Sequence, residues 1–189
     1  MRSLAVFCGS ATGSKAEYSE KAAGLGKLLA ERGIRIIFGG GKVGLMGILA
    51  DHALAAGGEV TGVIPDFLVH KEIAHDSVQE MIVTDSMLAR KQRIFELSDA
   101  FVALPGGFGT IDELFEMLTW LQLGRHRKPI GILNIDGYFD LLIAFLEKMV
   151  VEGFLKEQYL SMIVASDDPA ELLAKLERFE PPELEKWFR

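Results

Sequence analysis

The sequence has one cysteine, a shortage of basic residues and no long apolar run. A single thiol, Cys8, cannot form a disulfide within the chain, which suits a reducing compartment. It lies in an apolar run, where a free cysteine is usually a buried and inert core residue. No apolar stretch reaches the roughly 18 residues of a transmembrane helix, and residues 1–7 are too short and too weakly charged for a secretory signal. We therefore expect a cytoplasmic protein that binds no membrane.

Acidic residues outnumber basic ones. The 189 residues include 20 Lys and Arg against 27 Asp and Glu, a net charge of −7. A nucleic-acid surface needs clustered Lys and Arg to neutralise phosphates, so we expect no nucleic-acid partner. An anionic small molecule stays compatible with this charge, because a few local donors can outweigh it. The composition, 49% hydrophobic and 25% charged, is ordinary for a globular protein, and the length predicts a single domain over residues 1–189.

Short apolar runs alternate with longer amphipathic stretches. The runs are mostly continuous, which is typical of parallel strands covered on both faces. We predict strands at residues 4–8, 34–38, 60–64, 100–104, 130–133 and 162–165, with a weaker strand at 81–83. We predict helices at residues 16–32, 43–56, 88–97, 111–123, 138–152 and 169–178. The alternation predicts an α/β fold, with a doubly wound, mostly parallel sheet and helices on both faces. Residues 180–189 are predicted to be a surface tail.

Three of the predicted strands end in glycine-rich loops, at residues 9–13, 39–44 and 105–110. Glycine lets main-chain N–H groups approach a ligand, and a helix N-terminus attracts anions. Because the carboxyl ends of parallel strands share one edge of a sheet, we expect these loops to bind an anion or nucleotide there. Turn geometry alone is the alternative. No loop has the dinucleotide or P-loop pattern, so a dehydrogenase or kinase is poorly supported. The candidate ligand-binding loop residues are Gly9, Ser10, Gly40, Gly41, Gly106, Gly107, Gly109 and Thr110.

Two charged segments adjoin these loops. The helix after the third loop begins T-I-D-E, and this spacing alone favours a capping box with Thr110 as N-cap and Glu113 reaching back to it. The alternative places Glu113 in the ligand cleft with Glu116 on the same helix face, where paired carboxylates support acid–base chemistry or a cationic transition state. Arg90 and Lys91 open the preceding helix. Alone they favour a solvated basic face, yet an arginine there could also grip a phosphate or carboxylate with two donors.

Taken together, these segments resemble the LOG ("Lonely guy") family of cytokinin-activating phosphoribohydrolases, often labelled lysine decarboxylases. The family signature P-G-G-x-G-T-x-x-E stands at residues 105–113, and its R-K pair after a methionine stands at Met87, Arg90 and Lys91. The likeness runs through nearly the whole chain. Leu88 replaces a histidine and Ala11 a second serine of many members. Neither position carries the catalytic groups, so these departures bear on substrate preference rather than on activity.

The resemblance implies a Rossmann-like fold, a homodimer and hydrolysis of N6-modified AMP, with AMP itself accepted by some members. It implies that Arg90 and Glu113 are the catalytic pair. It also implies nucleotide contacts at Lys91 and residues 107–113, and at Glu72 and Thr119, with Met87 and Glu116 beside them. Without the resemblance, Glu72 is equally well a solvated loop carboxylate and Thr119 a helix hydroxyl at the edge of the core. The apolar helix at 111–123 fits a core or a dimer interface, and the family favours the dimer.

The implied chemistry is coherent without a metal or cofactor. Departure of the base leaves positive charge on ribose C1′. Glu113 would stabilise that charge and activate water, while Arg90 would position the ribose and its 5′-phosphate against the glycine loops. The four histidines form no metal-ligand motif. The alternative function is a non-catalytic nucleotide or cofactor carrier of the molybdenum-cofactor-carrier type, which needs the loops but not the pair. Lysine decarboxylation needs a lysine that forms a Schiff base with pyridoxal phosphate, and the sequence marks none.

Overall fold

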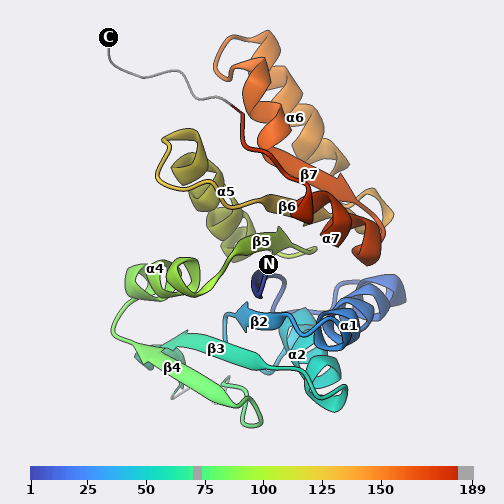
Figure 1. Cartoon of the computed structure of the whole chain (residues 1–189), viewed down its shortest axis with the longest axis vertical. Helices are drawn as coiled ribbons and strands as arrows, with labels where there is room; N and C mark the ends of the chain where they lie inside the picture. The colour runs from blue at the N-terminus through green and yellow to red at the C-terminus, as the bar shows by residue number, and fades with distance from the viewer. Residues whose placement is uncertain (70–73, 183–189) are drawn as a thin grey trace.

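The computed structural model describes residues 1–69 and 74–182, which form one seven-stranded parallel sheet (Figure 1). The strand order is β4-β3-β2-β1-β5-β6-β7, so the chain winds outward from β1 to β4 and returns to the other side of β1 as β5. This confirms the predicted doubly wound sheet. The strands are β1 Ser3–Phe7, β2 Arg35–Phe38, β3 Val60–Pro65, β4 Glu80–Thr84, β5 Ala100–Ala103, β6 Ile130–Leu133 and β7 Ile163–Ser166.

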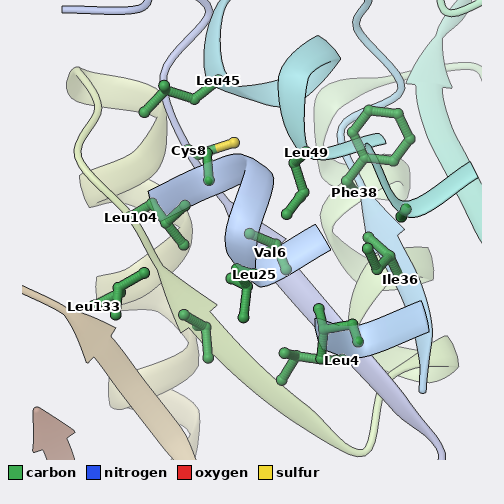
Figure 2. Packing of buried hydrophobic residues seen from close by; sticks show 14 of the residues in the cluster. Leu4, Val6, Cys8, Leu25, Ile36, Phe38, Leu45, Leu49, Leu104 and Leu133 are labelled. Atoms are coloured by element: carbon green, nitrogen blue, oxygen red, sulfur yellow. The ribbon is translucent and has the colours of Figure 1, made fainter. Parts of the chain in front are cut away.

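Helices cover both faces of the sheet. Because successive residues of a strand point to opposite faces, each central strand contributes side chains to two cores. In β1, Leu4 and Val6 join one core with α1, α2 and α7, and Figure 2 shows them packed near Leu25 and Leu49. Phe7 joins the other core, with α4, α5 and the segment around α6. The helices are α1 Ala16–Glu31, α2 Gly44–Ala55, α3 Asp66–Val69, α4 Met87–Leu97, α5 Phe108–Gln122, α6 Asp140–Val151 and α7 Pro169–Glu177, with 3-10 turns η1 Ile135–Gly137 and η2 Glu157–Met162.

The predicted strands are all confirmed, with each end within one residue of the prediction. Five of the six predicted helices have both ends within two residues of the prediction. The short elements α3, η1 and η2 were not predicted, because they are too short to show a periodic pattern. Most of the tail predicted at 180–189 lies outside the described residues. No helix of the described chain is both long and apolar enough to cross a membrane.

The start of α5 corrects a prediction. The helix begins at Phe108 with Gly107 as N-cap, three residues before the predicted start, so the capping box with Thr110 as N-cap is wrong. The physical reason is the close fold of the preceding loop: a Cβ added to Gly106 would lie 2.1 Å from Thr110 Oγ1. Glycine at 106 thus lets the chain turn directly into the helix, which places Thr110 in its first turn and frees Glu113 from a capping role.

Helices α1 and α2 pack closely against each other at Gly26. A Cβ added there would lie 2.4 Å from the carbonyl oxygen of Leu49 and 3.2 Å from the main-chain nitrogen of Ala53. Both contacts are with main-chain atoms, which cannot rotate away. Gly24, two residues earlier in the same helix, would meet nothing within 4 Å. Gly26 is therefore a packing requirement, whereas Gly24 is not.

We predict opposite effects of the same substitution at these two positions. Gly26→Ala should lower the free energy of unfolding by about 1–3 kcal/mol, because it overpacks the contact between the helices. Gly24→Ala should raise it by about 0.5–1 kcal/mol, because alanine loses less conformational entropy in a helix. Urea denaturation followed by circular dichroism measures both. Equal effects at the two positions would contradict the close approach at Gly26.

Candidate active site

The carboxyl ends of the central strands open into a cavity of about 330 Å³. It lies where the strand order reverses between β1 and β5, the position at which open α/β sheets bind ligands. Loops after β1, β2 and β5 meet there with the starts of α4 and α5. Eight of the residues predicted from the sequence line this cavity: Gly9, Ser10, Met87, Arg90, Gly107, Gly109, Thr110 and Glu113.

Arg90 and Glu113 meet in this cavity as an ion pair. Arg90 Nη1 lies 3.0 Å from Glu113 Oε1, and both residues are buried, with 9% and 7% of their surface exposed. Arg90 comes from the first turn of α4, whose start is fixed by the Ser86 hydroxyl accepting from the Ala89 N–H at 3.1 Å. Its Nε donates to the carbonyl of Val63 in β3 at 3.0 Å. Three elements of the fold therefore hold the pair.

Burial raises the pKa of the Glu113 carboxyl, and the nearby Arg90 guanidinium opposes this rise without cancelling it. Asp112 and Glu116 raise the pKa further, while Lys91 lowers it. The result is a carboxyl that is more basic than an exposed glutamate and is still held beside a permanent positive charge. Such a group suits a general base or the stabiliser of a developing cation.

Lys91 connects α4 to α5 beside this pair. Its Nζ lies 3.1 Å from Asp112 Oδ2 and 3.2 Å from Glu116 Oε2. Burial lowers the pKa of Lys91, but the hydrogen bonds and charges of Asp112 and Glu116 outweigh it, so the pKa is raised overall. Lys91 and Glu116 are not among the residues that line the cavity. Their predicted contact with substrate stays a prediction, and within this chain they tie the two helices together.

The remaining predicted residues lie elsewhere. Gly40 and Gly41 shape the loop after β2, where Gly40 has a φ of 74° and its carbonyl accepts from the His75 N–H, and Gly41 pairs with Ala74. Gly106 lines a neighbouring hollow with Tyr138.

Thr119 lies in an apolar hollow between α5, α6 and η2, where its hydroxyl donates to the carbonyl of Phe115 at 2.7 Å. This hollow is separate from the cavity that holds Arg90 and Glu113. Glu72 lies outside the described residues. The roles predicted for Thr119 and Glu72 therefore stay predictions.

Known proteins resemble this chain along most of its length. The model of a family described as "Possible lysine decarboxylase" matches residues 46–176. The cytokinin riboside 5′-monophosphate phosphoribohydrolase LOG of Oryza sativa subsp. japonica is 45% identical over 181 residues, which cover 95% of this chain and 74% of the relative. The phosphoribohydrolase LOG7 of Arabidopsis thaliana is 45% identical over 178 residues, covering 94% and 82%. The chain belongs to the LOG family.

Solved structures share the fold of this LOG-family chain at lower identity. The molybdenum cofactor carrier protein of Chlamydomonas reinhardtii has a TM-score of 0.71 at 25% identity, covering 93% of this chain and 96% of its own. The molybdenum cofactor binding protein of Rippkaea orientalis has a TM-score of 0.69 at 23% identity, covering 93% and 94%. The second likeness shows the Rossmann-like architecture alone.

Sequence reasoning did not single out Cys8, Met46 and Leu68, which also line the cavity. Gly39, Phe108 and Asp112 line it too, and they fall within the predicted loop 39–44 and the predicted contact segment 107–113. Phe108 occupies the variable position of the glycine signature and is 97% exposed. Cys8 was predicted to be buried and inert. It is buried, and desolvation raises the pKa of its thiol, as does the charge of Glu113, which keeps it in the unreactive thiol form.

Within residues 1–69 and 74–182, no group of three or more His, Cys, Asp or Glu side chains is placed to hold a metal ion. The charged residues that line the cavity are Arg90, Asp112 and Glu113, with Lys91 beside them, and the glycine loops contribute main-chain groups. These groups can bind an anion and stabilise a cation side by side.

The raised pKa of Glu113 predicts a specific pH dependence of stability. Between the ordinary glutamate pKa, about 4.3, and the raised value, the folded protein binds a proton that the unfolded chain has lost. Stability contributed by Glu113 therefore falls as the pH rises through this window. Glu113→Gln abolishes this titration, so its free energy of unfolding relative to the parent should increase with pH there, by at most about 1.4 kcal/mol per pH unit.

Urea unfolding at a series of pH values measures this difference. Glu96→Gln on the surface of α4 is the matched control, because hydrogen bonds from Gln92 and Arg93 lower the pKa of Glu96. The free energy of unfolding of Glu96→Gln relative to the parent should therefore decrease as the pH rises. A difference for Glu113→Gln that is constant with pH, or that has the sign of the control, contradicts a raised pKa at Glu113.

Proposed function

We propose that this LOG-family protein hydrolyses the N-glycosidic bond of adenosine 5′-monophosphates, including N6-substituted ones, and releases the free base and ribose 5-phosphate. The observation that carries this proposal is the buried ion pair of Arg90 and Glu113 at the junction of three glycine-rich loops. The Oryza and Arabidopsis relatives, named for this reaction on cytokinin riboside 5′-monophosphates, support it at 45% identity.

The N-terminus of α5 supplies the binding site for the 5′-phosphate. Gly107, Gly109 and Thr110 line the cavity at the first turn of this helix, where main-chain N–H groups have no partner within the helix. These N–H groups and the helix dipole favour an anion. Ser10 faces the same cavity from the loop after β1 and offers its hydroxyl, whereas the Gly9 N–H already donates to the Pro105 carbonyl at 3.0 Å. The phosphate therefore has donors on two sides, which orients the ribose toward the ion pair.

Glu113 performs the chemistry at C1′. As the base departs, its bonding electrons leave with it and C1′ becomes positively charged. The Glu113 carboxylate stabilises this charge, and its raised pKa makes it a stronger base for the proton of the attacking water. Arg90 keeps the carboxylate in place through the 3.0 Å ion pair and offers its remaining donors to the ribose phosphate. Water adds to C1′ and gives up one proton, the departing base takes up one proton, and the products are the free base and ribose 5-phosphate.

Apolar side chains at the cavity provide a surface for the base. Met46, Leu68, Met87 and Phe108 all line it. Phe108 and Met87 are exposed, at 97% and 39%, so an adenine ring and an apolar N6 substituent can cover them and remove that surface from water. This lining favours a substituted adenine over a small polar base.

Two other functions fit the site less well. A cofactor carrier needs the glycine loops but gives no reason for a buried ion pair beside them, and such a pair is costly to desolvate. Lysine decarboxylation needs an amine free to form a Schiff base. Lys91, the lysine next to Arg90, is paired with Asp112 and Glu116, and its raised pKa favours the unreactive ammonium form.

Substitution of Glu113 tests the proposed reaction. Glu113→Gln removes the charge with little change of volume, so kcat for base release from AMP should fall by at least about 100-fold. Purified protein is incubated with AMP, prenylated AMP, adenosine and ADP, and free base is measured by chromatography. Glu96→Gln, the same change on the exposed face of α4, should keep the parent rate.

The outcomes separate the candidate functions. Release of base from the monophosphates by the parent protein but not by Glu113→Gln supports the hydrolase. Near-parent rates in Glu113→Gln overturn the role of this carboxylate. Tight nucleotide binding by the parent protein without base release supports the carrier instead. The cytoplasmic location expected from the sequence stays a prediction.

We also propose that the chain forms a homodimer through α6 and its surroundings. Leu141 and Phe145 lie four residues apart on one face of α6 and are 86% and 53% exposed. Val151 and Phe154, beyond them, are 84% and 87% exposed. An apolar hollow of about 240 Å³ lies alongside, between α5, α6 and η2. Exposed apolar surface of this kind marks an interaction site, and a second copy of the chain would cover it.

A charge placed on this surface tests the dimer. Phe145→Glu should convert a dimer into a monomer, because the new carboxylate would be buried unpaired in the interface. Light scattering coupled to size-exclusion chromatography measures the mass. Val83→Glu is the control, since Val83 is equally exposed but lies in β4, at the opposite edge of the sheet from β7. A monomeric parent protein, or an unchanged mass in Phe145→Glu, contradicts this interface.

A further inference from the structure

The guanidinium of Arg90 occupies the space where a side chain of residue 39 would be. Gly39 follows β2 directly and lines the cavity. A Cβ added to it would lie 2.1 Å from Arg90 Nη2, 3.3 Å from Arg90 Cζ and 3.3 Å from Met46 Sδ. The first distance is far below van der Waals contact, so Arg90 and any side chain at position 39 compete for one volume.

Movement of Arg90 away from residue 39 would disturb the two contacts that hold its guanidinium. Its Nε is bound to the Val63 carbonyl at 3.0 Å and its Nη1 pairs with Glu113 at 3.0 Å. The residue is 9% exposed, so the guanidinium cannot swing into solvent without leaving both partners. Relief of a clash at Nη2 would therefore break the bond to β3, the ion pair to α5, or both.

Backbone conformation does not account for glycine at this position. Gly40 and Gly44, in the same loop, have φ values of 74° and 62°, a region that other residues avoid. Gly39 is not among the positive-φ glycines, so its backbone conformation is accessible to alanine. Position 39 has no space for a side chain, because the guanidinium of Arg90 occupies it.

We propose that Gly39 is a positioning residue of this site: its missing side chain creates the slot that holds the Arg90 guanidinium against Glu113. The inference deepens the proposed hydrolysis and rests on it. Gly39 itself touches no reacting atom. It acts through Arg90, by fixing where the positive charge lies relative to the carboxylate and to a bound ribose phosphate.

Displacement of Arg90 would change both geometry and charge. Misplacement of a catalytic group by about 1 Å can reduce a rate by about 100-fold. The charged groups that act on Glu113 are Arg90 and Lys91, which lower its pKa, and Asp112 and Glu116, which raise it. The thiol of Cys8 is near enough to feel the charge of Glu113. With the guanidinium withdrawn, burial and the two acids act on Glu113 with less opposition, so its pKa rises further.

Gly39→Ala tests the slot. We expect kcat for base release from AMP to fall by about 100-fold, and the acid limb of the pH–rate profile to move to higher pH. Gly131→Ala in β6 is the matched control: its Cβ would lie 3.1 Å from the side chains of Leu172 and Leu176, so it strains the core away from the site. It should lower stability while leaving kcat and the acid limb unchanged.

A double-substitution cycle shows whether Gly39 acts through Arg90. In an Arg90→Ala background the slot is empty, so adding Gly39→Ala should change kcat/KM by less than about twofold, although alone it has a large effect. The same double variant should fold even if Gly39→Ala does not, because alanine at position 90 leaves room for the new methyl group.

Two results would overturn the inference: parent-like kcat and acid limb in Gly39→Ala, or an equal loss with and without the arginine. If the parent protein releases no base, the proposed function is wrong. Crystal structures of the parent protein and of Gly39→Ala then test separately whether Gly39 positions Arg90. Arg90 Nη1 should leave Glu113 in the variant, and an ion pair retained at 3.0 Å refutes the slot.

Discussion

A single buried ion pair sets the demands on the rest of this structure. Arg90 and Glu113 are both withdrawn from water, and burying two charges is costly unless they are paired. The fold restrains this pair and its surroundings from several sides. Val63 in β3 binds the guanidinium, Lys91 ties α4 to α5 through two carboxylates, and Gly39 leaves room at the end of β2. The first and last of these contacts act on the guanidinium itself, and Lys91 holds the two helices that carry the pair.

The doubly wound sheet explains why these contacts meet. Because β5 returns to the side of β1 opposite β2, the helices that follow β4 and β5 cover the same face and start at the same edge. The first turn of α4 carries Arg90 and the second turn of α5 carries Glu113, two residues that are far apart in sequence. The molybdenum cofactor carrier of Chlamydomonas reinhardtii shares the architecture at a TM-score of 0.71. A shared architecture does not fix a function, so what this chain does depends on the side chains that it places at this edge of the sheet.

Much of this arrangement could be predicted from local pattern. Apolar runs predicted the strands to within one residue. The central strands are buried on both faces and tolerate few polar side chains, whereas β4 at the edge is partly exposed and gave a weaker pattern. Local pattern failed at α5, where T-I-D-E favoured Thr110 as the cap. The helix begins earlier because Gly106 allows a turn that no spacing rule encodes. It also failed to distinguish Thr119, which shares the helix of Glu113 but lies in a different hollow, because helix register alone does not say which neighbour each face meets.

The order of strands and helices, the glycine loops and the family signature at residues 105–113 were all evident in the sequence, since they depend on residues close together along the chain. The pairing of Arg90 with Glu113, the raised pKa of that carboxyl and the reason for glycine at position 39 were decided by tertiary structure. These properties depend on burial and on distances between separate elements. Desolvation and steric exclusion act through space, and neither is recorded in the spacing of residues along a chain.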